Sequence, residues 1–211
     1  MAEEIAEQKN KRARCVKIAL SGTHCSGKTT LAKTLEKKLA KKQFKVSCGL
    51  EVVRDCPFPV NEQGSGQAQI WIMLTQILTE LQLEESAEVV ILDRCVFDHL
   101  AYAKWLHERE RLSPNELAFL ESIAENWSKT HPYNIIAMPS PLPLTQDGFR
   151  SVNTRYQKQI QVILSKIYVA FAKHKPRETL IVKTSSEKRE VAKLMAKILE
   201  VIARQKNLLS K

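Results

Sequence analysis

Residues 16–30, VKIALSGTHCSGKTT, carry the side chains whose types and spacing best fit a chemical task. A mostly apolar run leads into GTHCSGKT at residues 22–29, which matches the pattern G-x-x-x-x-G-K-[ST] at every fixed position. A helical pattern that begins LAKTLEKKLAKK follows at once. A strand, this loop and a helix, in that order, form the setting in which the pattern holds the phosphates of a nucleotide. The sequence therefore predicts a phosphate-binding loop, or P-loop.

Each fixed residue of this loop has a physical role in holding a triphosphate. Gly22 and Gly27 allow the backbone to turn consecutive N–H groups toward an anion, and the helix that follows adds the positive end of its dipole. Lys28 supplies a positive charge, and Thr29 a hydroxyl ligand for Mg²⁺. We therefore predict ATP and Mg²⁺ as cofactors. The predicted ATP ligands here are Gly22, Thr23, His24, Cys25, Ser26, Gly27, Lys28, Thr29 and Thr30. The alternative is a glycine-rich turn that only joins a strand to a helix.

Asp93 is predicted to be the second Mg²⁺ ligand, beside Thr29. It follows the buried-strand run EVVIL at residues 88–92, and a strand-end acid of this kind holds the metal in P-loop proteins. The next residue is Arg94, where a glutamate would suit the activation of water. A cation suits the anchoring of a phosphate on a second substrate better. The alternative is a strand-end turn with a surface ion pair.

Glu51, at the end of the second predicted strand, is a candidate general base. A carboxylate there could accept the proton of a substrate hydroxyl during phosphoryl transfer. Arg54 could steady the same substrate, and Gln69 and Trp71 begin the helix beside this segment, so these three residues are predicted to bind it. The alternative is that Glu51 and Arg54 form a solvated ion pair.

A basic arm is predicted over about residues 139–158. It contains DGFR at residues 147–150, ending on Arg150, and brings Arg155 at the start of the next helix. Cations that move over a transferring phosphate stabilise the charge that spreads over its oxygens. We predict that Arg150 takes part in catalysis and that Arg155 contacts ATP. The alternative is a solvent-exposed basic loop.

Buried apolar runs alternate with helical patterns along the chain, which predicts an α/β fold with a parallel sheet covered on both faces. Ligands of such sheets bind at the carboxyl ends of the strands. The predicted strands are 16–20, Phe44–Cys48, Glu88–Leu92, Tyr133–Met138 and Thr179–Val182. The predicted helices are Lys28–Lys42, Gln67–Glu85, Val96–Glu110, one capped by Ser113 to Glu116, Asn153–Lys173 and one capped by Thr184 to Glu187.

The helix over Gln67–Glu85 is expected to carry Ile70, Leu74, Ile77 and Leu81 on one face. The predicted organisation is a charged lead-in over residues 1–15, a single domain over residues 16–206 and a tail over residues 207–211.

The net charge of +10 is unevenly distributed. Residues 1–50 carry +8, residues 51–130 carry −8 and residues 131–211 carry +10. Basic ends suit an anionic nucleotide, or nucleic acid, which we consider possible but do not favour. Five widely spaced cysteines without C-x-x-C indicate neither a disulfide framework nor a zinc site. No stretch reaches 18 apolar residues, so we expect a cytoplasmic protein without a membrane segment.

Together, these motifs resemble those of the P-loop kinase-like ATPases grouped around nicotinamide-riboside kinases and deoxynucleoside kinases. The resemblance rests on GTHCSGKTT, Glu51-x-x-Arg54 with the CPFPVNEQG that follows, ILDRC-x-x-D, and DGFR before a helix, and it spans about residues 16–202. It implies a three-layer, nucleoside-kinase-like P-loop NTPase fold whose five-stranded parallel sheet has the P-loop strand at its centre. It also implies that Glu51 is the counterpart of the proposed base and that Arg150 and Arg155 are lid arginines. A homodimer is compatible with it.

The leading functional hypothesis is an ATP- and Mg²⁺-dependent phosphotransferase that acts on a nucleoside, a nucleotide or a similar small hydroxylated acceptor. One alternative is a nucleotide-binding regulatory P-loop protein, or a slow NTPase, without a small-molecule acceptor. The other is a 5′-hydroxyl polynucleotide kinase, whose basic flanks would track a single strand.

Overall fold

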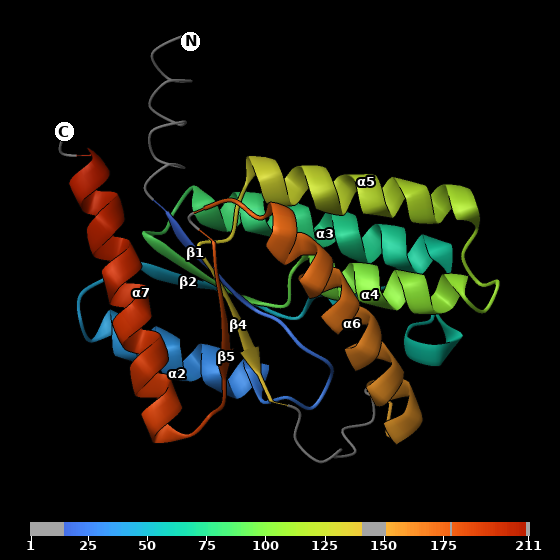
Figure 1. The fold of residues 1–211 in the computed structure, drawn as a ribbon, viewed down its shortest axis with the longest axis horizontal. Helices are drawn as coiled ribbons and strands as arrows, with labels where there is room; N and C mark the ends of the chain where they lie inside the picture. Colours follow the sequence, from blue (N-terminus) through green and yellow to red (C-terminus); the bar gives the residue numbers. More distant parts are fainter. Residues whose placement is uncertain (1–14, 141–150, 178, 210–211) are drawn as a thin grey trace, which may run out of the picture.

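Alternating apolar strands and amphipathic helices fold into three layers, with one parallel sheet between two layers of helices (Figure 1). The structure, a computed structural model, describes residues 15–140, 151–177 and 179–209. The strands are β1 Val16–Leu20, β2 Val46–Gly49, β3 Val89–Asp93, β4 Ile135–Pro139 and β5 Leu180–Thr184. The helices are α2 Lys28–Ala40, α3 Gly66–Glu84, α4 Val96–His107, α5 Pro114–Thr130, α6 Thr154–His174 and α7 Lys188–Leu209, with short 3-10 turns η1 Val52–Asp55 and η2 Asn61–Gln63.

The five strands are all parallel and lie in the order β2-β3-β1-β4-β5. The P-loop strand β1 is therefore central, as the resemblance implied. In the register of β1 and β3, Leu20 lies opposite Asp93. The chain leaves the carboxyl ends of these two strands in opposite directions along the sheet, which creates the crevice where α/β folds bind ligands.

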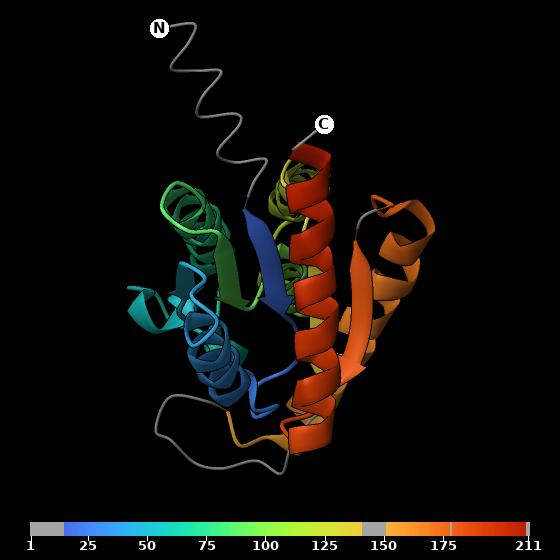
Figure 2. The same cartoon turned by 90° about the vertical axis from the view of Figure 1, so that its left-hand side faces the viewer.

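The side chains of the sheet divide between two hydrophobic layers. Val16, Ile18 and Leu20 of β1 pack with the inner faces of α2 and α7, whereas Ala19 packs with α3, α4, α5 and α6. Figure 2 shows α7 in front of the sheet, on the face opposite α3, α4 and α5. β1 and β3 are buried along their whole length, as continuous apolar strands of a doubly covered sheet must be.

All the predicted strands and helices exist, and their ends differ from the predicted ones by at most four residues. The capping box that begins α5 is confirmed: the Ser113 hydroxyl accepts from the Glu116 N–H (3.3 Å), and the Glu116 carboxylate accepts from the Ser113 N–H (2.7 Å). The box expected at Thr184 is wrong, because Thr184 ends β5 and its hydroxyl donates to the Ser185 carbonyl. Helix α7 reaches Leu209, inside the predicted tail.

The predicted apolar face of α3 is only partly buried. Ile70, Ile77 and Leu81 pack against the core, but Leu74 is 41% exposed. The most deeply buried positions of α3 include the polar residues Gln69, Gln76 and Glu80. The partners of these polar residues decide which side of α3 is buried. The spacing of apolar residues in the sequence carries no information about those partners.

A buried charged cluster explains why polar side chains of α3 lie in the core. Lys17 of β1 donates to Glu80 (3.0 Å) and to Glu84 (2.8 Å), and all three side chains are at most 6% exposed. Glu80 also accepts from the indole of Trp127 (2.9 Å) and the hydroxyl of Tyr133 (3.1 Å). The Lys17 ammonium lies over both aromatic rings, at 5.1 and 4.8 Å from their centroids. Because Lys17 and Glu80 each have several partners and Glu84 is paired with Lys17, the cluster can exist in the core.

Lys17→Ala tests the energetic importance of this cluster. The substitution leaves two buried carboxylates without their cation, so we expect the free energy of unfolding to fall by about 3–5 kcal/mol. Chemical denaturation followed by circular dichroism measures the change. Lys129→Ala is the matched control, because Lys129 and Glu125 form a pair in which both side chains are more than half exposed, so its loss should leave the free energy of unfolding nearly unchanged. Equal effects of the two substitutions would contradict a structural role of the buried cluster.

Candidate active site

The carboxyl ends of β1 and β3 bring together the two segments that the sequence predicted to bind nucleotide. Asp93 ends β3 beside Leu20, and the Arg94 N–H donates to the Leu20 carbonyl (3.0 Å). The loop over residues 21–27 starts at this point and turns back into α2. At its end Gly27 has a φ of 73°, a left-handed conformation that glycine adopts without steric cost. The first turn of α2 therefore points its unpaired N–H groups into the loop.

Lys28 is buried and bound to its own loop. Its ammonium donates to the carbonyls of Gly22 (3.0 Å) and Thr23 (2.7 Å) and to the hydroxyl of Ser26 (3.2 Å). Burial, followed by repulsion from Arg94, lowers the pKa of Lys28 to about 8. A phosphate at the loop would replace these neutral acceptors with a charged one, which is a stronger partner for an ammonium.

Thr29 and Asp93 meet where a divalent cation would be held. The Thr29 hydroxyl donates to Asp93 Oδ2 at 2.5 Å. The other carboxylate oxygen, Asp93 Oδ1, is buried and has no hydrogen-bond partner among the residues that the structure describes. A hydroxyl and a carboxylate are oxygen ligands of the kind that Mg²⁺ prefers, and an unpaired buried carboxylate oxygen needs such a partner. The residues present therefore fit Mg²⁺.

Asp98, to which the sequence analysis assigned no role, ties the P-loop to α4. One carboxylate oxygen accepts from the Gly22 N–H (2.8 Å), and the other accepts from the Cys95 N–H (3.0 Å) at the start of α4. Asp98 is 1% exposed. The sequence signals were its place as the last residue of ILDRC-x-x-D and at the third position of a helix, where an acid caps the first turn.

Arg94 and Glu51 form a buried ion pair beneath the loop. Nε and one terminal nitrogen of Arg94 both donate to Glu51 Oε1, at 2.9 and 2.7 Å. The other terminal nitrogen donates to the Gly22 carbonyl (3.3 Å) and to the Tyr102 hydroxyl (3.5 Å). Glu51 and Arg94 are 6% and 4% exposed. The interpretation of Arg94 as a surface ion pair is therefore excluded, and its guanidinium holds Glu51 against the loop.

Arg94 adopts an unusual backbone conformation to make these contacts. Its φ is 94°, which is strained for a residue with a Cβ atom. Arg54 adds a second cation at 3.4 Å from Glu51 Oε2, but its side chain is 45% exposed. The Glu51–Arg54 pair is thus half solvated, in contrast to the pair with Arg94.

A small cavity of about 30 Å³ opens beside Glu51 and Arg94. Gln69 lines it, as predicted for a substrate-binding residue, whereas Trp71 and Arg54 do not. Six further lining residues were not predicted from the sequence. They are Val53, Val60, Asn61, Ile72, His99 and Tyr102. Burial, followed by repulsion from Arg94, lowers the pKa of His99 to about 3, so His99 is neutral at physiological pH.

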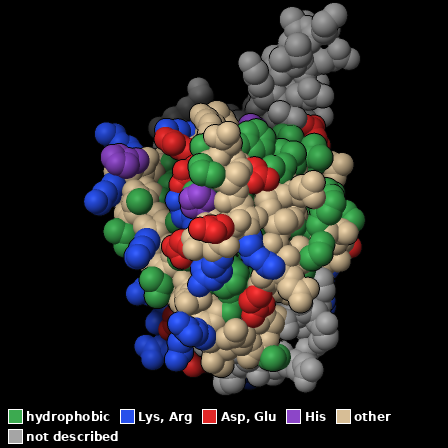
Figure 3. All heavy atoms as spheres, turned by 90° about the vertical axis from the view of Figure 1, so that its right-hand side faces the viewer, with side chains coloured by type: hydrophobic (Ala, Val, Ile, Leu, Met, Phe, Trp, Pro, Cys, Tyr) green, Lys and Arg blue, Asp and Glu red, His purple; other side chains and the backbone are tan. Residues whose placement is uncertain are grey.

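The described residues include only part of the predicted arm, residues 139–140 and 151–158. Arg150 lies outside the described residues. Arg155 is exposed and, with Lys158 and Glu108, lines an open groove of about 540 Å³ along α6. Figure 3 shows Lys and Arg side chains interspersed with hydrophobic ones along this edge of the molecule. The first turn of α6 does reach the loop, because the Gln157 amide donates to the His24 carbonyl (2.9 Å).

Two comparisons place this architecture among known proteins. A family model described as an AAA domain matches residues 17–189, which is most of the chain. The chain belongs to this AAA domain family. No curated protein matches it. None of the helices in the described ranges is long and apolar enough to cross a membrane.

Solved structures of low sequence identity share the fold of this AAA domain. The crystal structure of the NadR protein in complex with NR superimposes with a TM-score of 0.69 and 16% identity, over 96% of this chain and 58% of that one. A deoxyadenosine kinase from M. mycoides with bound dCTP gives a TM-score of 0.61 and 16% identity, over 88% of this chain and 99% of that one. This chain thus spans 58% of the NadR structure. The resemblance to P-loop kinase-like ATPases and the predicted fold class are confirmed.

Thr29→Val tests the metal site of this AAA domain. The substitution removes the hydroxyl that lies 2.5 Å from Asp93. We expect binding of a non-hydrolysable ATP analogue with Mg²⁺ to weaken by at least about tenfold, because a hydrogen bond or ligand to a charged group contributes about 1.5–3 kcal/mol. Binding in EDTA should change little. Calorimetric titration with and without Mg²⁺ separates the two effects.

Thr34→Val is the matched control, because Thr34 lies on the same helix and its exposed hydroxyl donates only to the Thr30 carbonyl. If Thr29→Val and the control responded to Mg²⁺ equally, Thr29 would not be a metal ligand.

Proposed function

We propose that the protein is an ATP- and Mg²⁺-dependent phosphotransferase whose acceptor is a nucleoside, a nucleotide or a similar small hydroxylated molecule. The observation that carries the proposal is the buried pair of Glu51 and Arg94. It places a carboxylate in a cavity and ties it, through the Gly22 carbonyl, to the loop that would hold the triphosphate. A carboxylate in this place lies where the base for an acceptor hydroxyl would be required in phosphoryl transfer.

The P-loop residues would bind and orient the triphosphate. The N–H groups of the loop and the start of α2 would face the phosphates, with Lys28 exchanging its loop carbonyls for phosphate oxygens. Thr29 and Asp93 would hold Mg²⁺. When bound, this ion neutralises charge on the phosphate oxygens. Arg150 and Arg155 remain candidates for cations that approach the phosphates from the arm.

Glu51 would accept the proton of the acceptor hydroxyl. Its Oε1 atom is held by two N–H groups of Arg94, and Oε2 lies 3.4 Å from Arg54. Each carboxylate oxygen has two acceptor positions, so Glu51 can accept a further hydrogen bond. A carboxylate paired with arginine is a weak base. This suits phosphoryl transfer through a loose transition state, in which the base chiefly orients the hydroxyl.

An acceptor of nucleoside size would require the cavity to enlarge. A cavity of about 30 Å³ has room for no more than a few water molecules. Val53, Val60 and Asn61 form one wall and belong to the 3-10 segment over residues 52–63, the least regular part of the site. The small cavity also favours the alternative of a nucleotide-binding regulatory protein or slow NTPase without an acceptor.

A screen with radiolabelled ATP distinguishes these two functions. The protein is incubated with Mg²⁺, ATP labelled on the γ-phosphate and a panel of nucleosides, nucleotides and other small alcohols. Labelled phosphate on an acceptor supports the proposal. Labelled inorganic phosphate alone, or nucleotide binding without any transfer, would contradict it.

Glu51→Gln tests the proposed base once an acceptor is found. The substitution keeps the shape but removes the negative charge, so we expect turnover to fall by about 10²-fold or more while ATP affinity stays within about threefold of wild type. Single-turnover kinetics and equilibrium binding separate these effects.

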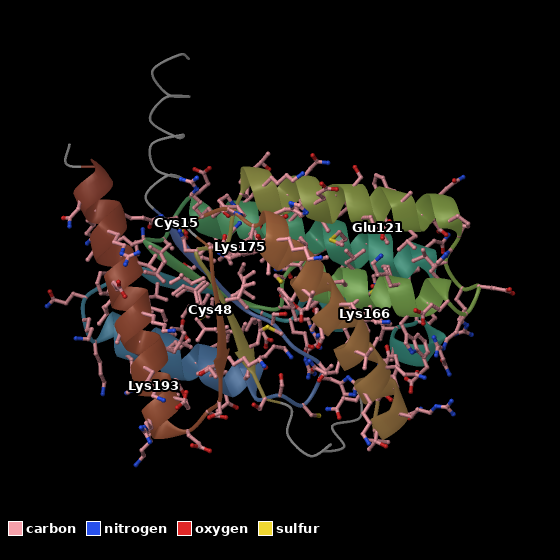
Figure 4. All side chains as sticks on the ribbon, viewed as in Figure 1. Cys15, Cys48, Glu121, Lys166, Lys175 and Lys193 are labelled. Atoms are coloured by element: carbon pink, nitrogen blue, oxygen red, sulfur yellow. The ribbon has the colours of Figure 1, made fainter. Side chains whose placement is uncertain are left out.

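Glu121→Gln makes the same charge change on α5, across the molecule from α2 (Figure 4), where Glu121 pairs with Lys104. It should leave both quantities unchanged. Full turnover by Glu51→Gln would remove Glu51 as the base.

A further inference from the structure

Gln76 connects the cavity to the buried charged cluster beneath it. It lies on α3, is 2% exposed and has three polar neighbours. Its amide nitrogen donates to Glu80 Oε1 (2.9 Å) and to the Arg94 carbonyl (3.4 Å). Its amide oxygen lies 3.3 Å from Nε2 of His99, which lines the cavity.

The chemistry of these neighbours determines the orientation of the Gln76 amide. A carboxylate and a backbone carbonyl can only accept hydrogen bonds, so the NH₂ group must face Glu80 and Arg94. The amide oxygen then faces His99. Because Glu80 is itself held by Lys17, Trp127 and Tyr133, its carboxylate cannot turn away. The charged cluster of the core therefore sets the direction of a hydrogen bond next to the cavity.

This direction decides which nitrogen of His99 carries the proton. An amide oxygen accepts only, so Nε2 must be the N–H that donates to it. A neutral imidazole has one such proton, which leaves Nδ1 as an acceptor.

The His99 ring also stays neutral, because burial and the nearby Arg94 guanidinium lower its pKa. The charged and titratable groups around it are Glu51, Arg94, Tyr102 and His24, which line the same cavity, and Glu80, which acts through Gln76.

We propose that Gln76 is a positioning residue that holds His99 as a hydrogen-bond acceptor in the cavity, so that the site selects molecules bearing an N–H or O–H donor. This selection rests on the proposed function, since it takes the cavity as the acceptor site. The alternative tautomer, with the proton on Nδ1, would instead favour a carbonyl or ring nitrogen of the ligand. The orientation of the Gln76 amide thereby determines whether the site prefers ligand groups that donate a hydrogen bond or groups that accept one.

Nitrogen NMR of histidine-labelled protein tests the positioning without any activity. His99 is assigned by the signal that disappears in His99→Gln. We expect a neutral ring with a protonated Nε2 and an unprotonated Nδ1 throughout pH 5–8. Protonation of the ring near its usual pKa of about 6.5, or a proton on Nδ1, would overturn the proposal.

Gln76→Met removes the polar atoms of the relay and keeps the size of the side chain. We expect the His99 ring to populate both tautomers, while the affinity for an ATP analogue stays within about threefold of wild type. If this variant does not fold, Gln76→Glu serves instead, because a carboxylate beside Nε2 should raise the pKa at which His99 titrates. Gln82→Met is the control, since Gln82 lies on the same helix and is exposed. An unchanged His99 spectrum in a folded Gln76 variant would overturn the proposal.

Paired nucleosides test the selection itself. Adenosine and cytidine carry an exocyclic amine, which purine riboside and 2-pyrimidinone riboside lack. We expect at least one amine-bearing nucleoside to shift the His99 Nδ1 signal and to bind about tenfold or more tightly than its partner. Equal effects within both pairs, or no effect of any of the four, would overturn the selection. The radiolabel screen scores the proposed function separately, because transfer to a nucleoside that leaves His99 unperturbed would support the function and contradict only this inference.

Discussion

The buried guanidinium of Arg94 is the interaction on which the site depends. A charge that is 4% exposed must be paired, and Arg94 is paired with Glu51 from the segment after β2 and with the Gly22 carbonyl of the P-loop. Its φ of 94° has a cost on the order of 1–3 kcal/mol, which these bonds offset. The ends of three strands are therefore tied together by one side chain. The geometry of the phosphate loop and the position of the carboxylate beside it cannot vary independently.

A second set of buried charges, around Lys17, is connected to the first through Gln76. Lys17 and its two carboxylates occupy a place where apolar residues of similar volume could pack without loss of stability. The ions instead fix the orientation of the side chains around them, because each partner can be satisfied in only one arrangement. Glu80 fixes the orientation of the Gln76 amide, which also contacts the Arg94 carbonyl and Nε2 of His99. Core and cavity thus form one continuous polar network within a mostly apolar α/β sandwich.

Local sequence patterns predicted the elements well, and the failures share a physical cause. The capping box of α5 was correct because it involves only neighbouring residues. The box at Thr184 failed because strand pairing extended β5 to that residue, which is a tertiary effect. The apolar periodicity of α3 did not predict the deep burial of Gln76 and Glu80, because these two residues are buried by partners from other elements. No local pattern contains that information.

The sequence by itself determined the strand, loop and helix of the phosphate site, because Gly27, Lys28 and the residues around them act through backbone geometry and charge that neighbours decide. It also placed Asp93 and Glu51 at strand ends, since parallel strands present their carboxyl ends at one edge. Only the tertiary structure decided what these residues meet. Glu51 could equally have been a solvated surface acid, and it became a buried partner of Arg94 because the order β2-β3-β1 lays their strands side by side. Contacts between residues more than 40 positions apart arise from packing, and packing is a property of the whole chain.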